Sequence, residues 1–300
     1  MGMGLDLYNK FPMARSMFDE AEQISGYSLG RLCFEGPAEE LNRDLPAQLA
    51  VYTVSCILTE LLREEGAVPD AVSGYSSGFY AAAYAARCFN FSTGVRLVLK
   101  AGRILLEEGR RFPGGMALIF GLKADRVEQI CEQTGCVQVA IRNTSSQIII
   151  SGLSASLEVA MDQCRRAGAL DAYVLPVGAA YHSRFMKNAE SRLMDATTRM
   201  PLRSPSIPLI SYLTLSPVPE DKSLRRVIAA QVSGPVKWAE LITSLSQLGT
   251  QRIVEAGPGA IISRTVRWID RSMEAVQAGD YPGVLKVATS LNTARIPGVK

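Results

Sequence analysis

The stretch Ala71-Val72-Ser73-Gly74-Tyr75-Ser76-Ser77-Gly78-Phe79 decides both the fold of this chain and the chemistry that we expect of it. It precedes an alanine-rich run at 81–86, and together they predict a short strand, a sharp turn and a helix. Gly74 and Gly78 flank Ser76 in a G-x-S-x-G spacing, in which small neighbours relieve crowding at a strained turn. We expect Ser76 to attack a carbonyl, with the Ser77 N–H at the helix start binding the oxyanion. The alternative is that small residues merely pack a tight turn.

Composition places the chain among globular proteins. Its 300 residues are 47% hydrophobic and 20% charged, which suffices for one large domain or two unequal ones. A formal net charge of +3 does not favour binding to nucleic acid, and no stretch reads as a continuous membrane span. The six cysteines form no C-x-x-C pair, so we expect free thiols in a reducing compartment, the cytoplasm.

The order of helical and strand patterns predicts an α/β protein with one domain inserted into another. The run 47–62 is apolar almost all round, which is typical of a buried helix. After residue 177 helices and short strands resume, ending in a strand at 251–255 and a helix at 260–269. We therefore expect the large domain to span residues 1–114 and 177–300.

Residues 115–176 form the expected insert. Strands are predicted at 116–121, 137–141, 147–151 and 172–176, with helices at 124–133 and 154–167. Ser154 is a candidate N-cap for the second helix. The order β-α-β-β-α-β is that of a ferredoxin-like fold, whose ends lie close enough for insertion.

His182 is the only histidine in the chain. A serine nucleophile needs a base, and histidine is the commonest one near neutral pH. His182 lies just beyond the predicted domain boundary, where a cleft would form. A lone histidine is also often a surface or core residue without a catalytic role, and sequence alone does not pair it with Ser76.

Six motifs in order along the chain resemble the malonyl-CoA:acyl-carrier-protein transacylases and the acyltransferase domains of polyketide synthases. They are Pro69–Gly78, Gly115-Met116-Ala117 with Gly121-Leu122, Asn143–Gln147 with Ile150-Ser151-Gly152, Tyr181-His182-Ser183 with Met186, Gln231 with Pro235-Val236 and Trp238, and Glu255–Gly259. Together these motifs run through nearly the whole chain.

The resemblance implies a large α/β domain with a central, mostly parallel sheet and a ferredoxin-like insert. It also implies a ping-pong reaction, in which Ser76 takes a malonyl or related acyl group from coenzyme A and passes it to the phosphopantetheine thiol of acyl carrier protein. His182 would act as base, the backbone carbonyl of Gln231 would orient it, and the Ser77 N–H would bind the oxyanion. The residues that the resemblance places in the substrate pocket are Gln48, Tyr75, Ala101, Asn143 and Tyr181. It implies no metal or redox cofactor beyond the coenzyme A thioester substrate, and we expect a monomer.

Three side chains depart from the family's pattern. The residue before the nucleophile, commonly histidine, is Tyr75, and the residue after the second glycine, commonly glutamate, is Phe79. Ala101 replaces the arginine that pairs with the free carboxylate of malonyl. Arg103 lies about 200° around a helix from that position, so it should face elsewhere.

The start of the chain is a further departure. The resemblance begins at Met1 with the helix that follows the family's opening strand, so that strand and its glycine-glutamine loop are missing. A first strand of this kind is central and buried in a doubly wound sheet, and its loop supplies a second oxyanion N–H. We therefore expect the natural start to lie upstream of Met1.

Several other functions stay open at this point. One is an acyltransferase for acyl groups without a carboxylate, or a thioesterase acting on acyl-carrier thioesters, which Ala101 favours. Another is a degenerate paralogue that binds carrier protein without turnover, which the missing loop favours and the retained Ser76 and His182 oppose. An α/β-hydrolase esterase is less favoured, since residues 183–300 follow a histidine that such enzymes place near the C-terminus. Arg184 and Lys187 are candidate contacts for an acidic carrier protein.

Overall fold

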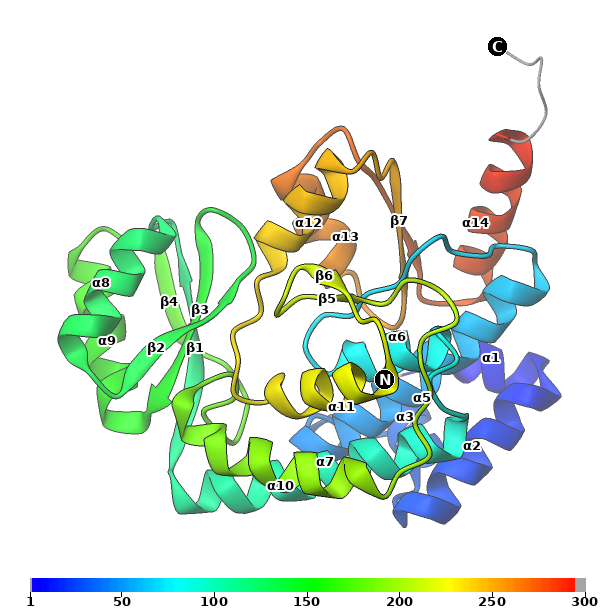
Figure 1. The fold of residues 1–300 in the computed structure, drawn as a ribbon, viewed down its shortest axis with the longest axis horizontal. Helices are drawn as coiled ribbons and strands as arrows, with labels where there is room; N and C mark the ends of the chain where they lie inside the picture. The colour runs from blue at the N-terminus through cyan, green and yellow to red at the C-terminus, as the bar shows by residue number, and fades with distance from the viewer. Residues whose placement is uncertain (1, 295–300) are drawn as a thin grey trace.

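Two long helices, α5 (Asp44–Glu64) and α7 (Phe91–Arg111), pack against each other and organise the larger part of the molecule. The computed structural model describes residues 2–294 (Figure 1). By length and composition α5 could cross a membrane, although the sequence patterns predict no such stretch. However, 72% of its apolar stretch is buried inside the fold, so α5 is the central helix of the core.

Shorter helices surround this pair. They are α1 (Leu5–Lys10), α2 (Pro12–Ser25), α3 (Leu29–Phe34), α4 (Ala38–Leu41), α6 (Gly78–Ala85), α10 (Lys187–Thr198), α11 (Asp221–Ala230), α12 (Trp238–Gln247), α13 (Ile261–Ile269) and α14 (Tyr281–Ala294). A short 3₁₀ turn, Arg184–Met186, leads into α10. The sequence patterns do not predict α14, because Tyr281 and Pro282 follow a Gly-Asp pair that reads as a loop.

The larger part contains both parallel and antiparallel strand pairings, all of them short. Strand β7 (Arg252–Ala256) pairs in parallel with β8 (Glu274–Ala278), a strand that the sequence patterns do not predict. Before the nucleophile turn, Val72 pairs in parallel with Leu209 in a single bridge instead of a full strand. Strand β5 (Ile210–Ser211) is short and pairs in antiparallel fashion with β6 (Ser216–Pro217). These short ladders leave most of the nucleophile segment in loop backbone.

The smaller part, at the left of Figure 1, is a four-stranded sheet covered by two helices. Its elements are β1 (Gly114–Phe120), α8 (Ala124–Thr134), β2 (Val137–Arg142), β3 (Gln147–Leu153), α9 (Ser154–Arg166) and β4 (Asp171–Val174). The strand order is β2-β3-β1-β4 and every pairing is antiparallel, which is the ferredoxin-like arrangement. Ser154 is the first helical residue and Leu153 occupies the cap position, since β3 continues into α9 without a loop; the expected Ser154 cap is therefore wrong.

The two faces of this sheet have different partners. Ala117, Ile119 and Ile150 pack in the core beneath α8 and α9, whereas Met116 and Leu118 pack with the core of the larger part. Successive side chains of a strand point to opposite faces, so one strand serves both cores. The sheet is therefore covered by its own helices on one side and forms a wall against the larger part on the other.

We predict that Gly94→Ala lowers the free energy of unfolding by about 1–3 kcal/mol, the usual cost of overpacking. Gly94 lies in the first turn of α7, and a methyl group there would overlap the Tyr52 ring on α5. Urea denaturation followed by circular dichroism measures the change. Gly78→Ala is the matched control, because a methyl group at Gly78 meets no other atom within 4 Å. Equal stability of the two variants would contradict the prediction.

Candidate active site

The turn that carries Ser76 joins the Val72 bridge to α6. Ser76 has a φ of 52°, in the left-handed region that non-glycine residues rarely occupy. A side chain at Gly74 would overlap the backbone of Gly78 and Phe79, so the turn closes only because Gly74 has none. The G-x-S-x-G spacing thus produces the strained turn that it predicts.

His182 lies on the loop between β4 and the 3₁₀ turn, and it too has a left-handed backbone, with a φ of 59°. Its side chain is 5% exposed, and its N–H donates to the Val232 carbonyl at 2.9 Å. The Nε2 atom lies 2.8 Å from Ser76 Oγ, although the two residues are 106 positions apart. This hydrogen bond joins the nucleophile and the base that the sequence proposes separately.

The second ring nitrogen identifies the group that orients the imidazole. His182 Nδ1 lies 3.0 Å from the backbone oxygen of Gly234. A carbonyl oxygen only accepts, so the proton is on Nδ1 and Nε2 is free to accept from the Ser76 hydroxyl.

The expectation that the Gln231 carbonyl holds the ring is therefore corrected. The chain turns after α11, with the Gly234 N–H donating to the Ala230 carbonyl, and this turn brings the Gly234 oxygen to the ring. The backbone groups of Gly234 and Gln231 both raise the pKa of His182, while the ring hydrogen bond itself goes to the Gly234 oxygen. The Gln231 side chain is buried and accepts a hydrogen bond from the Tyr212 hydroxyl.

Burial determines the protonation state of the base. Burial lowers the pKa of His182 below its ordinary value of 6.5, while the carbonyls of Gly234 and Gln231 oppose that shift. The imidazole is consequently neutral near pH 7 and able to accept a proton.

The Ser77 N–H is placed for oxyanion binding. Ser77 occupies the N-cap position of α6 without a side-chain capping bond, and the positive end of the helix dipole lies beside Ser76. The N–H groups of the three residues that follow donate to the carbonyls of Tyr75, Ser76 and Ser77. Within residues 2–294 the Ser77 N–H has no such partner, so it is free to donate to an oxyanion on a substrate.

A cavity of about 660 Å³ opens above this pair, between the larger part and the sheet wall of the smaller part. Of the residues expected in the substrate pocket, it contains Gln48, Tyr75, Asn143 and Tyr181. Its inner wall is apolar, with side chains from α7, β1, β2 and β3: Leu105, Met116, Leu118, Ile141 and Ile149. The buried Tyr181 hydroxyl has no hydrogen-bond partner among the described residues, and burial together with the Asp44 carboxylate raises the pKa of Tyr181.

Tyr75 connects the nucleophile turn to the smaller part. Its hydroxyl donates to Asn143 Oδ1 at 2.7 Å, and its ring meets that of Trp238 edge-on at 5.4 Å. Asn143 follows β2, which is fastened to the larger part by the parallel bridge between Ile141 and Val236. The tyrosine that departs from the family's pattern is thus a link between the two walls of the cavity.

Ala101 does not line the cavity, contrary to the expectation. It is fully buried in α7, one helical turn before Leu105, which does line the cavity. Lys100 and Arg103 are exposed on the other side of that helix. Along the described chain, Arg264 of α13 is the one lysine or arginine that lines the cavity.

The structure adds site residues that sequence reasoning missed. Gly234 contributes through its backbone oxygen, which has no side-chain signature. Ile261, Arg264 and Trp268 of α13 line the cavity. The sequence carried no signal for them, because their exposure, which is unusual for isoleucine and tryptophan, is visible only in the structure.

Comparison with known proteins identifies the family of this chain. A sequence model described as the acyl transferase domain matches residues 1–287. The chain belongs to the acyl transferase domain family. The motif resemblance is thereby confirmed.

Individual relatives match over most of their length. The chain is 32% identical to a malonyl CoA-acyl carrier protein transacylase of Bacillus subtilis (strain 168), over 96% of this chain and 92% of that protein. It is also 32% identical to the polyketide biosynthesis malonyl CoA-acyl carrier protein transacylase PksC of the same organism, over 92% of this chain and 94% of that protein. The solved malonyl CoA-acyl carrier protein transacylase of Coxiella burnetii superposes with a TM-score of 0.92. It is 28% identical, and the match covers 97% of this chain and 93% of that one.

We predict that acylation of this acyl transferase domain keeps more than half of its maximal rate at pH 6.5 and falls to half only at a lower pH. The base must be neutral to accept the Ser76 proton, and the pKa of His182 is lowered from 6.5. Single-turnover acylation measured between about pH 5 and pH 8 provides the test. A rate that already falls to half its maximum above pH 6.5 would contradict the assignment of His182 as the base.

Proposed function

We propose that this chain is an acyltransferase that moves a malonyl or related acyl group from coenzyme A to the phosphopantetheine thiol of acyl carrier protein. The observation that carries the proposal is the 2.8 Å hydrogen bond between Ser76 and His182 at the base of the cavity. The named relatives are malonyl CoA-acyl carrier protein transacylases, and one similar solved structure is a malonyl-transacylase in complex with a type II polyketide synthase acyl-carrier protein. Two relatives are named as polyketide biosynthesis proteins, which supports our proposal that the reaction serves fatty acid or polyketide biosynthesis.

The first half-reaction acylates the serine. Ser76 Oγ attacks the thioester carbonyl carbon while His182 Nε2 takes its proton, and the Ser77 N–H donates to the oxyanion that forms. The carbon–sulfur bond then breaks, and the proton on His182 passes to the departing coenzyme A thiolate. Acyl-Ser76 remains, and the Gly234 carbonyl stabilises the imidazolium that exists in between.

The second half-reaction reverses these steps with a different thiol. The phosphopantetheine thiol gives its proton to His182 and attacks the acyl-Ser76 carbonyl. The carbon–oxygen bond breaks, and His182 returns the proton to Ser76. No metal or redox cofactor takes part in this proposal.

We also propose that the protein acts as a monomer in the cytoplasm. One chain supplies both Ser76 and His182, and its six cysteines are free thiols, five of them buried. Size-exclusion chromatography with light scattering tests the oligomeric state.

We predict that Ser76→Ala abolishes the acyl adduct that intact mass spectrometry detects after incubation with malonyl-CoA. His182→Ala should slow adduct formation by about two to four orders of magnitude, the usual contribution of a positioned base. Ser183→Ala is a neighbouring control, since that buried hydroxyl donates to the Ala180 carbonyl and faces neither catalytic group. An undiminished adduct on the Ser76→Ala protein would remove Ser76 as the nucleophile.

A second candidate substrate is an acyl group without a free carboxylate. A carboxylate buried without a partner loses several kcal/mol of solvation, so a pocket that prefers malonyl needs a cation near its inner end. Apolar side chains form that end, and the sole lysine or arginine along the cavity within residues 2–294 is Arg264. Arg264 is exposed on α13, whereas Ala101 is buried and uncharged.

We predict that malonyl-CoA and acetyl-CoA acylate Ser76 at rates within about tenfold of each other. Leu105→Arg, which places a cation at the inner wall, should shift that ratio toward malonyl-CoA through charge-assisted hydrogen bonds. Arg103→Ala is the control, because that exposed side chain does not line the cavity. A strong malonyl preference of the native protein that survives Arg264→Ala would refute the prediction.

A further inference from the structure

The rim of the catalytic cavity exposes three large apolar side chains. Tyr173 of β4 is 46% exposed, Ile261 of α13 is 61% exposed and Trp268 of α13 is 75% exposed. All three line the cavity that contains Ser76. Exposed apolar side chains gathered at the edge of one cavity indicate an interaction surface.

The helix that carries two of them is rigidly held. The Glu255 carboxylate accepts hydrogen bonds from the N–H groups of Ile262 and Ser263 at the start of α13, at 3.0 and 2.9 Å. Farther along, Thr265 Oγ1 accepts from the Trp238 indole at 3.0 Å. The opposite side of α13 is therefore fixed, and its outer face is organised before any partner arrives.

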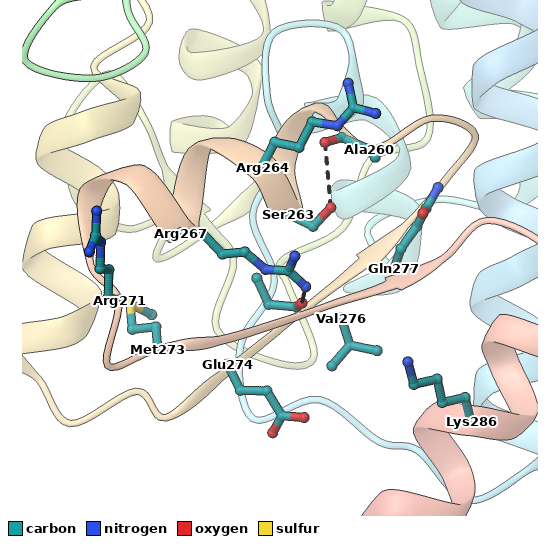
Figure 2. Close-up of a pocket in the computed structure, with 11 residues that line it drawn as sticks. Ala260, Ser263, Arg264, Arg267, Arg271, Met273, Glu274, Val276, Gln277 and Lys286 are labelled. Carbon is teal, nitrogen blue, oxygen red and sulfur yellow. Dashed lines mark hydrogen bonds between the residues drawn. The ribbon is translucent and has the colours of Figure 1, made fainter.

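A second cavity, of about 820 Å³, lies between α13, β8 and α14, and its charged residues are mostly basic. Figure 2 shows Arg264 and Arg271 near the two ends of α13, with Lys286 across the cavity on α14. Within residues 2–294 these three cations form no ion pair, while the one acidic residue of the cavity, Glu274, is paired with Arg252 at 2.6 Å. Arg264 lines both cavities, so the basic surface is continuous with the mouth of the active site.

We propose that this surface, made of Ile261, Arg264, Trp268, Arg271 and Lys286 and called here the α13 face, is where acyl carrier protein docks. The α13 face would receive a carrier surface with acidic side chains around an apolar contact. Its helical part, Ile261–Ile269, extends about 12 Å at 1.5 Å per residue, which suits contact with a helix of the partner. This inference rests on the proposed function and locates the partner of its second half-reaction.

The candidates chosen from sequence are less suited to this role. Lys187 is paired with Glu190 at 2.8 Å, and neither Arg184 nor Lys187 lines either cavity. Cations without a partner at the mouth of the active site are available to an acidic protein, whereas paired ones must first break an existing contact.

The decisive variant is the double charge reversal Arg271→Glu/Lys286→Glu, since neither residue lines the catalytic cavity. Acylation by acyl-CoA is followed by intact mass, and discharge of acyl-Ser76 is measured with a holo acyl carrier protein and, separately, with free pantetheine. We expect discharge to the carrier protein to slow by about tenfold or more at low salt, because like charges now face each other. Discharge to pantetheine and acylation by acyl-CoA should change less than about twofold, and the salt dependence of carrier transfer should weaken.

The matched control is Arg96→Glu/Lys100→Glu, a double charge reversal on the exposed side of α7, away from both cavities. Equal slowing by the control and the test variant would overturn the proposal, as would unchanged carrier transfer in the test variant. If the test variant slowed acylation by acyl-CoA but left carrier transfer unchanged, the α13 face would instead bind the nucleotide of coenzyme A. A native protein that is acylated but discharges to neither thiol would refute the proposed function rather than the docking surface.

Discussion

The hydrogen bond between Ser76 Oγ and His182 Nε2 is the constraint on which the rest of the site depends. Both residues have left-handed backbones, which costs conformational energy that the surrounding structure must offset. The lack of a side chain at Gly74 allows one turn to close. The other is held by the His182 backbone N–H, which donates to the Val232 carbonyl, and by its Nδ1–H, which donates to the Gly234 carbonyl. Two strained turns from distant parts of the chain thus meet within hydrogen-bonding distance.

The inserted sheet supplies the other half of the site through its alternating side chains. Ile119 and Ile150 pack beneath the sheet's own helices, so Met116 and Leu118 necessarily face the larger part and the cavity. The Tyr75–Asn143 hydrogen bond connects this wall to the nucleophile turn.

Much of the local structure was predictable, and the failures have identifiable causes. The β-α-β-β-α-β order of the insert's elements was predictable from local patterns, and the pairing of β1 with the later strands β3 and β4 is the arrangement that this order implies. By contrast, the strand before Ser76 shortens to one bridge at Val72, since strand length depends on distant partners. Ser154 is helical instead of a cap, because β3 continues directly into α9. Strand β8 was missed because its Glu-Ala-Val-Gln-Ala sequence has few of the residues typical of strands.

The sequence by itself determined the nucleophile turn, the ferredoxin-like order of the insert and the family, because each is encoded by side chains at short, regular spacings. Only the tertiary structure decided that His182 reaches Ser76, that the Gly234 carbonyl orients it and that Ala101 stays out of the cavity. These features depend on how distant segments approach one another and on backbone atoms, which every residue shares. Every residue has a backbone carbonyl, so the amino-acid sequence does not indicate which carbonyl will lie beside the histidine.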